Sequence, residues 1–164
     1  MWHLAIPADD DAIVSMCLAL NREDPGQERV GADQVRRTLH VLREQPSRGR
    51  AIVLDLDGRA AGYALLIGYW SNEIGGELCC IDEIYVAPEA RAQGHGSALI
   101  RALARGEGPW SAGAVAITLE VTPSNERALA FYERLGFRGH NRGLRLRVQS
   151  DERLTARSKV GVSG

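Results

Sequence analysis

Two carboxylates and one phenol in this sequence are side chains of types that can move protons. Asp82 and Glu83 lie inside the apolar segment Ile81–Val86, which is typical of a strand. Neighbours on a strand point to opposite faces, so only one of the two carboxylates is expected to line a cleft, and we favour Glu83 with Asp82 as its substitute. The alternative for both is a solvated face or an ion pair with an arginine. Tyr132 has a phenol, with an ordinary pKa of about 10, that can donate a proton or simply pack beside Phe131.

A glycine turn follows the segment that carries the carboxylates. Gly94 and Gly96 stand between that predicted strand and a predicted helix. Two glycines at this spacing let the backbone approach a ligand and direct several N–H groups to one point at the positive end of a helix. The turn therefore suggests a site for a phosphorylated cofactor, although many such turns need glycine for geometry alone. A dinucleotide fingerprint would need a third glycine where Leu99 stands, and the chain contains no Gly-Lys-Ser or Gly-Lys-Thr of a Walker loop.

A second segment, about thirty residues further on, completes a recognisable pattern. It contains Asn125, Ala128, Phe131-Tyr132 and Gly136-Phe137. Together with the stretch from Arg91 to Gly96, it resembles the GNAT superfamily of acyl-CoA-dependent N-acetyltransferases. The cofactor loop of that family reads Arg/Gln-x-x-Gly-x-Gly/Ala, and its later segment reads Asn-x-x-Ala-x-x-Phe-Tyr-x-x-x-Gly-Phe. The resemblance covers nearly the whole chain apart from its last residues.

This resemblance implies that acetyl-CoA is bound in a split between two strands. Backbone N–H groups of the glycine turn would hold the pyrophosphate, with Arg91 facing the phosphates. The strand before the turn would pair through its backbone with the pantetheine arm, and an N–H near Val86 would polarise the acetyl carbonyl. Asn125 would contact the pantetheine arm, cap the last helix, or do both. The residues assigned to the cofactor are Ile84, Tyr85, Val86, Arg91, Ala92, Gln93, Gly94, His95, Gly96, Ser97 and Asn125.

Ala92 departs from the family pattern, because family members often have glycine there. We expect the change to be tolerated if φ stays negative at this position.

The resemblance also implies a reaction. Glu83 would act as the base, directly or through water, and Tyr132 as the acid. An acetyl group would pass directly to a primary amine of a small molecule such as a polyamine, an amino acid or an aminoglycoside. The alternatives are acetylation of a protein N-terminus or lysine, a non-catalytic acyl-CoA-binding sensor, and a purely structural domain. Acceptor choice is expected in the loop from Asn21 to Gly31 and near Tyr69-Trp70, whose aromatic rings either wall a pocket or belong to the core.

The elements that position these residues follow from periodicity. Strands are predicted for residues 2–6, 51–55, 60–70, 78–86 and 114–121, with short strands near Phe137 and over 144–148. Helices are predicted from residue 7 to about 20, over 32–44, 96–104 and 125–135, and Asp57-Gly58 predicts a hairpin turn. The order predicts a mixed α/β fold with about four helices, and the resemblance implies a strongly twisted, largely antiparallel sheet that splays at the cofactor. Residues 1–149 form one predicted domain and residues 150–164 a mobile tail.

The bulk properties restrict the partners. A formal net charge of −1 over 164 residues provides no overall positive field for nucleic acid, so a small-molecule amine is the expected partner. The longest apolar run is too short for a membrane span, and the N-terminus lacks a signal-peptide pattern, so a cytoplasmic protein is expected. Three cysteines, Cys17, Cys79 and Cys80, are expected to be free thiols, and four scattered histidines predict no metal site. Dimers are common in the family, so a homodimer is one expected assembly.

Overall fold

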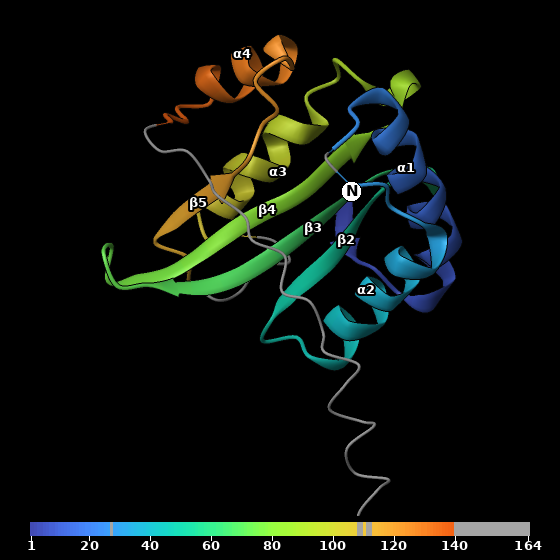
Figure 1. Ribbon diagram of the computed structural model, residues 1–164, viewed down its shortest axis with the longest axis horizontal. Helices are drawn as coiled ribbons and strands as arrows, with labels where there is room; N and C mark the ends of the chain where they lie inside the picture. Colours follow the sequence, from blue (N-terminus) through green and yellow to red (C-terminus); the bar gives the residue numbers. More distant parts are fainter. Residues whose placement is uncertain (27, 108–109, 111–112, 140–164) are drawn as a thin grey trace, which may run out of the picture.

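Strands and helices follow one another along the chain largely in the order that the periodicity predicts. The computed structural model describes residues 1–26, 28–107, 110 and 113–139. Its strands are β1 (Trp2–Leu4), β2 (Gly49–Leu56), β3 (Arg59–Ser71), β4 (Gly76–Val86) and β5 (Ala116–Leu119). Its helices are α1 (Asp10–Glu23), α2 (Ala32–Glu44), α3 (His95–Ala104) and α4 (Glu126–Arg134), with short 3₁₀ turns at Pro7–Asp9 and Pro88–Ala90 (Figure 1).

The strands form one sheet in the order β1-β2-β3-β4-β5. All neighbours are antiparallel except β4 and β5, which run parallel. The hairpin between β2 and β3 turns at Asp57 and Gly58, where φ is 54° and 78°, as their tolerance of positive φ predicts. The mixed α/β fold with a largely antiparallel sheet is therefore confirmed.

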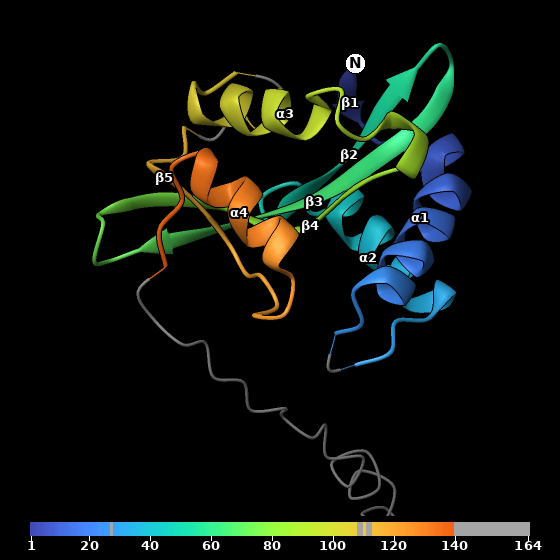
Figure 2. The same cartoon turned by 90° about the horizontal axis from the view of Figure 1, so that it is seen from above.

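Helices cover both faces of this sheet, because side chains on a strand alternate between faces. Val53, Tyr63 and Leu65 pack against α1 and α2 on one face. Leu66 and Ile81 pack against α3 on the other face, together with partly buried side chains of α4. Figure 2 shows α3 on the opposite side of the sheet from α1 and α2, and Figure 1 shows α4 next to α3 near β5. The glycine turn thus connects β4 to α3, which packs on the face of the sheet opposite α1 and α2.

Some predicted elements differ from the observed ones. The predicted strand 114–121 contracts to β5, and the predicted strand 2–6 contracts to β1. Phe137 lies in no strand, because its N–H bonds the Tyr132 carbonyl at 3.1 Å and continues the turn that ends α4. The predicted strand over 144–148 and the predicted tail 150–164 lie outside the described residues.

The cysteines agree with the prediction of free thiols. Cys17 and Cys79 are buried and Cys80 is partly buried, and none of the three forms a disulfide. Among the helices of the described residues, none is both long enough and apolar enough to span a bilayer.

Candidate functional site

The pairing between β4 and β5 ends halfway along β4. Their pairing runs from Leu78 opposite Ala116 to Ile81 opposite Leu119, where β5 ends. β4 continues to Val86 paired with β3 alone among the described strands, and its arrow runs on past the end of β5 in Figure 1. The sheet is therefore open over the last five residues of β4, where the sequence places the carboxylates.

The open edge of β4 carries backbone groups that β3 does not use. The Ala87 N–H donates to the Ala61 carbonyl of β3 at 2.8 Å. Successive residues of a strand direct their N–H and C=O groups to alternate sides, so Ile84 and Val86 direct theirs away from β3. The Arg91 Nε donates to the Val86 carbonyl at 2.8 Å, in agreement with this direction. An extended ligand with amide groups could pair here as an added strand.

A β-bulge at Asp82 sets the faces of the two carboxylates. Leu66 pairs with Ile81 but the preceding Leu65 pairs with Glu83, so Asp82 is the inserted residue of the bulge. The bulge turns Glu83 toward the α1 face, whereas Ile81 faces α3. Asp82 is exposed and Glu83 half-buried. The geometry thus places Glu83, half-buried, on the α1 face of the sheet and leaves Asp82 exposed.

Glu83 is held by two buried donors. Its Oε2 accepts a hydrogen bond from the Tyr63 hydroxyl at 2.7 Å and a longer one from Cys17 Sγ at 3.5 Å. Tyr63 is 0% exposed and Cys17 1% exposed. Burial raises the pKa of Glu83 above its ordinary value, the two donors oppose that rise, and the charge of Asp82 adds to it. Nothing in the sequence marks Tyr63 or Cys17 as a partner of Glu83, since both occupy positions where an apolar residue would fit the pattern equally well.

The glycine turn ends in a helix N-terminus with free donors. Gly94 is the N-cap of α3 with φ of 83°, and the Ala98 N–H closes the first helical turn on the Gly94 carbonyl at 2.9 Å. The N–H groups of His95, Gly96 and Ser97 precede this bond, so they have no partner within the helix. The first turn of α3 also contains no acidic side chain. These groups suit a phosphate, because the N–H donors and the helix dipole both favour negative charge.

The side chains around this turn are held in place. The Trp2 indole donates to the His95 carbonyl at 3.0 Å and ties β1 to the start of α3. Gln93 donates through Nε2 to the Glu89 carbonyl at 3.0 Å, and the Ser97 hydroxyl donates to the Gly94 carbonyl at 2.9 Å. These hydrogen bonds fix the shape of the turn.

Ala92 corrects one expectation about this turn. We expected a negative φ, but Ala92 has φ of 62°, in the left-handed region that glycine adopts without strain. The closure between the 3₁₀ turn and α3 requires this conformation, and an alanine there costs about 1–2 kcal/mol.

Ala92→Gly should therefore stabilise the protein. Relief of the strain exceeds the extra backbone entropy of glycine, so the free energy of unfolding should rise by about 0.5–1 kcal/mol in urea titrations. Gly94→Ala is the matched opposite change and should lower it by about 1 kcal/mol. A loss of stability in Ala92→Gly would show that the turn does not hold its left-handed conformation in solution.

Arg91 is tied to the end of α1. Its Nη2 lies 2.7 and 3.0 Å from the two Glu23 carboxylate oxygens, and its guanidinium lies 5.2 Å from the centre of the Tyr85 ring. The Tyr85 hydroxyl donates to the same Glu23 carboxylate at 3.2 Å. These bonds occupy much of the guanidinium, so a contact of Arg91 with phosphate remains a prediction.

Asn125 joins two helices across the open end of the sheet. Its Oδ1 accepts from the Ala128 N–H at 3.0 Å, which confirms the predicted N-cap of α4. Its Nδ2 donates to Asp24, the C-cap residue of α1, at 2.7 Å. The contact with a pantetheine arm stays a prediction, but the same side chain fixes the start of α4 relative to α1.

α4 also borders the opening through its aromatic residues. A Cβ built on Gly96 would lie 3.5 Å from the Phe131 ring and 4.0 Å from the Ile84 side chain, so α3, α4 and β4 meet there. Tyr132 lies edge-on to Phe131 and Phe137, with ring centres 5.1 and 5.6 Å away. Burial raises the pKa of Tyr132, which keeps its phenol protonated at neutral pH. Its role as an acid remains a prediction.

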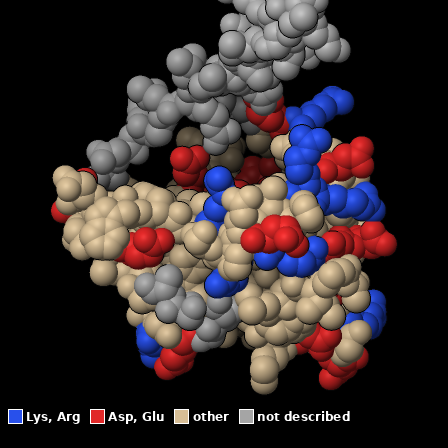
Figure 3. Space-filling view, turned by 90° about the horizontal axis from the view of Figure 1, so that it is seen from below, with Lys and Arg blue, Asp and Glu red and all other residues tan. Residues whose placement is uncertain are grey.

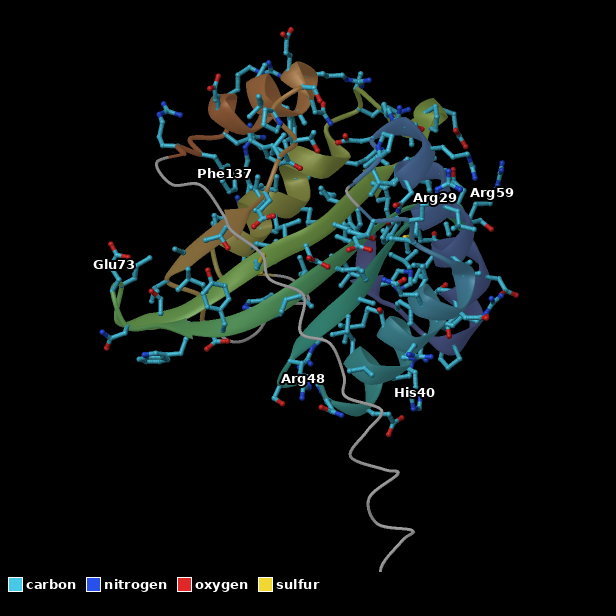
Figure 4. All side chains as sticks on the ribbon, viewed as in Figure 1. Arg29, His40, Arg48, Arg59, Glu73 and Phe137 are labelled. Atoms are coloured by element: carbon cyan, nitrogen blue, oxygen red, sulfur yellow. The ribbon has the colours of Figure 1, made fainter. Side chains whose placement is uncertain are left out.

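Tyr69 and Trp70 fit neither of their two predicted roles, as walls of a pocket or as part of the core. They pair with Leu78 and Glu77, at the end of β3 away from Tyr63 and Glu83. Figure 4 places Glu73 at the tip of this hairpin and Arg59 near the opposite end of β3. Both rings are exposed, Tyr69 to 47% and Trp70 to 67%, so they neither wall the opening nor belong to the core.

The charged side chains of the surface are mixed. On the face drawn in Figure 3, Lys and Arg side chains lie among Asp and Glu side chains. This mixture agrees with the net charge of −1.

Comparisons with known proteins agree on one family. The model of the acetyltransferase (GNAT) family matches residues 13–137. Glucosamine 6-phosphate N-acetyltransferase of Trypanosoma brucei brucei is 42% identical over 90 residues, which are 54% of this chain and 58% of that protein. The match thus spans little more than half the length of that relative.

Solved structures repeat the fold. A possible acetyltransferase of Clostridium difficile 630 superposes with a TM-score of 0.76 at 19% identity, covering 92% of this chain and 97% of the other. Ribosomal-protein-alanine N-acetyltransferase of Brucella melitensis biovar Abortus 2308 gives a TM-score of 0.68 at 17% identity, covering 90% and 99%. At these identities the likeness shows the fold, whereas the family match extends over well over half of the sequence. The chain therefore belongs to the GNAT family of acetyltransferases, whose members use acetyl-CoA.

Proposed function

We propose that this protein is an N-acetyltransferase that moves an acetyl group from acetyl-CoA directly to a primary amine of a small molecule. One juxtaposition supports this most strongly. The edge of β4 that faces away from β3, with the backbone of Ile84 and the N–H of Val86, leads toward the N–H groups of α3 that have no partner within the helix, and the half-buried Glu83 lies on the same strand. An amide-rich arm, a pyrophosphate and an amine thus have complementary groups along one continuous path.

The residues present suit coenzyme A. The N–H groups of His95, Gly96 and Ser97 would hold the pyrophosphate, assisted by Gln93 and Gly94. Ile84 and Val86 offer the backbone pairing that an amide-containing arm needs. A Cβ on Gly96 would make ordinary van der Waals contact with Phe131, so the start of α3 lies close to α4. When bound, acetyl-CoA supplies the thioester whose acetyl group is transferred.

Glu83 is the proposed base. The acceptor amine arrives as an ammonium ion and must lose a proton before its nitrogen can form a bond to the acetyl carbon. Glu83 takes that proton as the N–H bond breaks, directly or through water. Its raised pKa improves its strength as a base at neutral pH relative to an ordinary glutamate. Asp82, exposed on the bulge, is the substitute if Glu83 does not reach the amine.

Tyr132 is the proposed acid. As the new C–N bond forms, the C–S bond breaks, and Tyr132 donates its phenolic proton to the departing sulfur. The nitrogen loses its second proton to solvent as the amide forms. The proton taken up by Glu83 also returns to solvent, and solvent reprotonates the Tyr132 phenol, so one proton is released for each acetyl group transferred. No cysteine is assigned to the reaction, because Cys17 is buried and its thiol stays protonated with a pKa raised to about 11.

A small-molecule acceptor is the favoured class. The relative with 42% identity is named for glucosamine 6-phosphate, which is a small primary amine. This supports amino sugars as the first compounds to test, ahead of polyamines, amino acids and aminoglycosides.

Turnover with a panel of amines tests the proposal. Purified protein with acetyl-CoA should release free thiol with at least one amine of these four classes, and mass spectrometry should find the acetylated product. Glu83→Gln serves as the matched control for uncatalysed acetyl transfer. Turnover confined to peptide N-termini or lysines would favour a protein acetyltransferase, and binding of acetyl-CoA without turnover of any amine would favour a sensor module.

A further inference from the structure

We propose that Tyr63 and Cys17 are positioning residues that hold one oxygen of Glu83, so that the other oxygen exchanges the proton of the acceptor amine. This inference rests on the proposed function, in which Glu83 is the base. It assigns a role to two buried side chains that carry polar atoms in the apolar layer between α1 and the sheet.

The two donors converge on a single atom. The Tyr63 hydroxyl on β3 and the Cys17 thiol on α1 both contact Oε2 of Glu83, at 2.7 and 3.5 Å. Within the described part of the chain, Oε1 accepts no hydrogen bond of its own. The carboxylate is therefore anchored on one side and left with one oxygen for a proton, which needs a fixed geometry for efficient transfer.

Both donors are themselves fixed. Tyr63 is fully enclosed, and its ring lies 6.3 Å from that of Tyr85. The Asn21 amide donates to the Cys17 carbonyl at 3.0 Å and approaches its sulfur at 3.8 Å. Burial and the charge of Glu83 raise the pKa of both Tyr63 and Cys17, so each remains a donor throughout the neutral pH range.

The groups around Glu83 determine how its pKa should respond when a donor is removed. Glu83 faces Cys17 from α1, Tyr63 from β3 and the charge of Asp82 on its own strand. Glu23 and Arg91 pair with each other beside Tyr85. The two donors stabilise the ionised form of Glu83 against burial and against Asp82, so removal of either donor should raise the pKa of Glu83 further. A higher pH would then be needed to ionise the base.

Tyr63→Phe tests this directly, since it removes one hydroxyl from a filled core position. The acidic limb of the kcat/KM profile should move up by about one pH unit, with roughly tenfold lower activity below the limb and recovery above it. Cys17→Ala should shift the limb less, because its contact is longer, and Cys17→Ser should restore the donor and the limb. Tyr69→Phe is the matched control, since its exposed ring lies at the other end of β3, and its profile should equal that of the parent protein.

A second readout separates this inference from the proposed function. Carbon-13 NMR of glutamate carboxyl groups in the free protein, assigned with Glu83→Gln, follows the titration of Glu83 without any turnover. Tyr63→Phe should raise that titration midpoint and the kinetic limb together. An unchanged midpoint would overturn the positioning role. A raised midpoint with an unmoved kinetic limb would keep the hydrogen bonds but contradict Glu83 as the base, and with it the proposed mechanism.

Discussion

Glu83→Gln is expected to lower kcat/KM by roughly 10²- to 10⁴-fold, the usual contribution of a positioned general base. Glutamine keeps the shape of the side chain and an oxygen that accepts the Tyr63 hydroxyl, but it cannot take a proton from an ammonium ion. The fold and the affinity for acetyl-CoA should therefore change little. Steady-state kinetics with the best amine of the panel, combined with a thermal melt, would measure both properties.

The raised pKa of Glu83 should also make the stability of the protein depend on pH. Burial raises the pKa of Glu83 above that of the unfolded chain, so between the two values the folded protein holds the extra proton. Stability should fall as pH rises through this window, whereas activity should rise, because only the ionised carboxylate is a base. Glutamine does not titrate, so Glu83→Gln should lack this contribution to the pH dependence of stability. The melting temperature of the variant relative to that of the parent protein should therefore rise as pH increases.

Asp82→Asn is the comparison variant for the kcat/KM measurement, because it tests which of the two carboxylates is the base. Asp82 is exposed on the bulge and carries the same charge one residue earlier, so its replacement should change kcat/KM by no more than about threefold. A larger loss in Asp82→Asn than in Glu83→Gln would make Asp82 the base.

Ser97→Asp is expected to weaken acetyl-CoA binding by roughly 30- to 100-fold. Ser97 lies in the first turn of α3, beside the N–H groups proposed to hold the pyrophosphate. A carboxylate about 6 Å from a phosphate, at an effective dielectric constant near 20, repels it by about 2–3 kcal/mol. Isothermal titration calorimetry at fixed ionic strength would measure the change in Kd.

The same substitution should not destabilise the free protein. A negative charge in the first turn of a helix stabilises it by about 0.3–1 kcal/mol, and this turn contains no acidic residue. The melting temperature without ligand should thus stay level or rise while the affinity falls. Ser97→Asn, of the same shape without the charge, should bind acetyl-CoA within about threefold of the parent protein. Equal weakening in both variants would mean that shape, and not phosphate charge, explains the loss.

Local patterns predicted the elements of this fold well. The order of strands and helices, the turn at Asp57-Gly58 and the N-cap at Asn125 all depend on a few neighbouring residues, and the structure confirms them. The glycine turn was likewise predicted from its local sequence, and Gly94 has the positive φ that favours glycine. The assignment to the family followed from two such local segments.

The parts that could not be predicted depend on distant contacts. The bulge at Asp82 exists only in the register of β4 against β3, so the sequence alone could not say which carboxylate turns toward α1. The positive φ of Ala92 depends on how the chain closes between the 3₁₀ turn at Pro88–Ala90 and α3, which local propensity does not predict. The contact of Asn125 with Asp24 joins residues 101 positions apart. The donors of Glu83 come from α1 and β3, and nothing in their local sequence marks them as polar partners.

We propose that acetyl-CoA binds in the opening between β4 and β5 and at the first turn of α3. A thermal melt with and without acetyl-CoA tests this binding. At a ligand concentration near 100 times Kd, binding to the native state should add ~2.7 kcal/mol, a rise of roughly 5–10 °C in Tm for a domain of this size. The rise should persist in Glu83→Gln and shrink in Ser97→Asp. An unchanged Tm up to millimolar acetyl-CoA and related acyl-CoAs would contradict the claim.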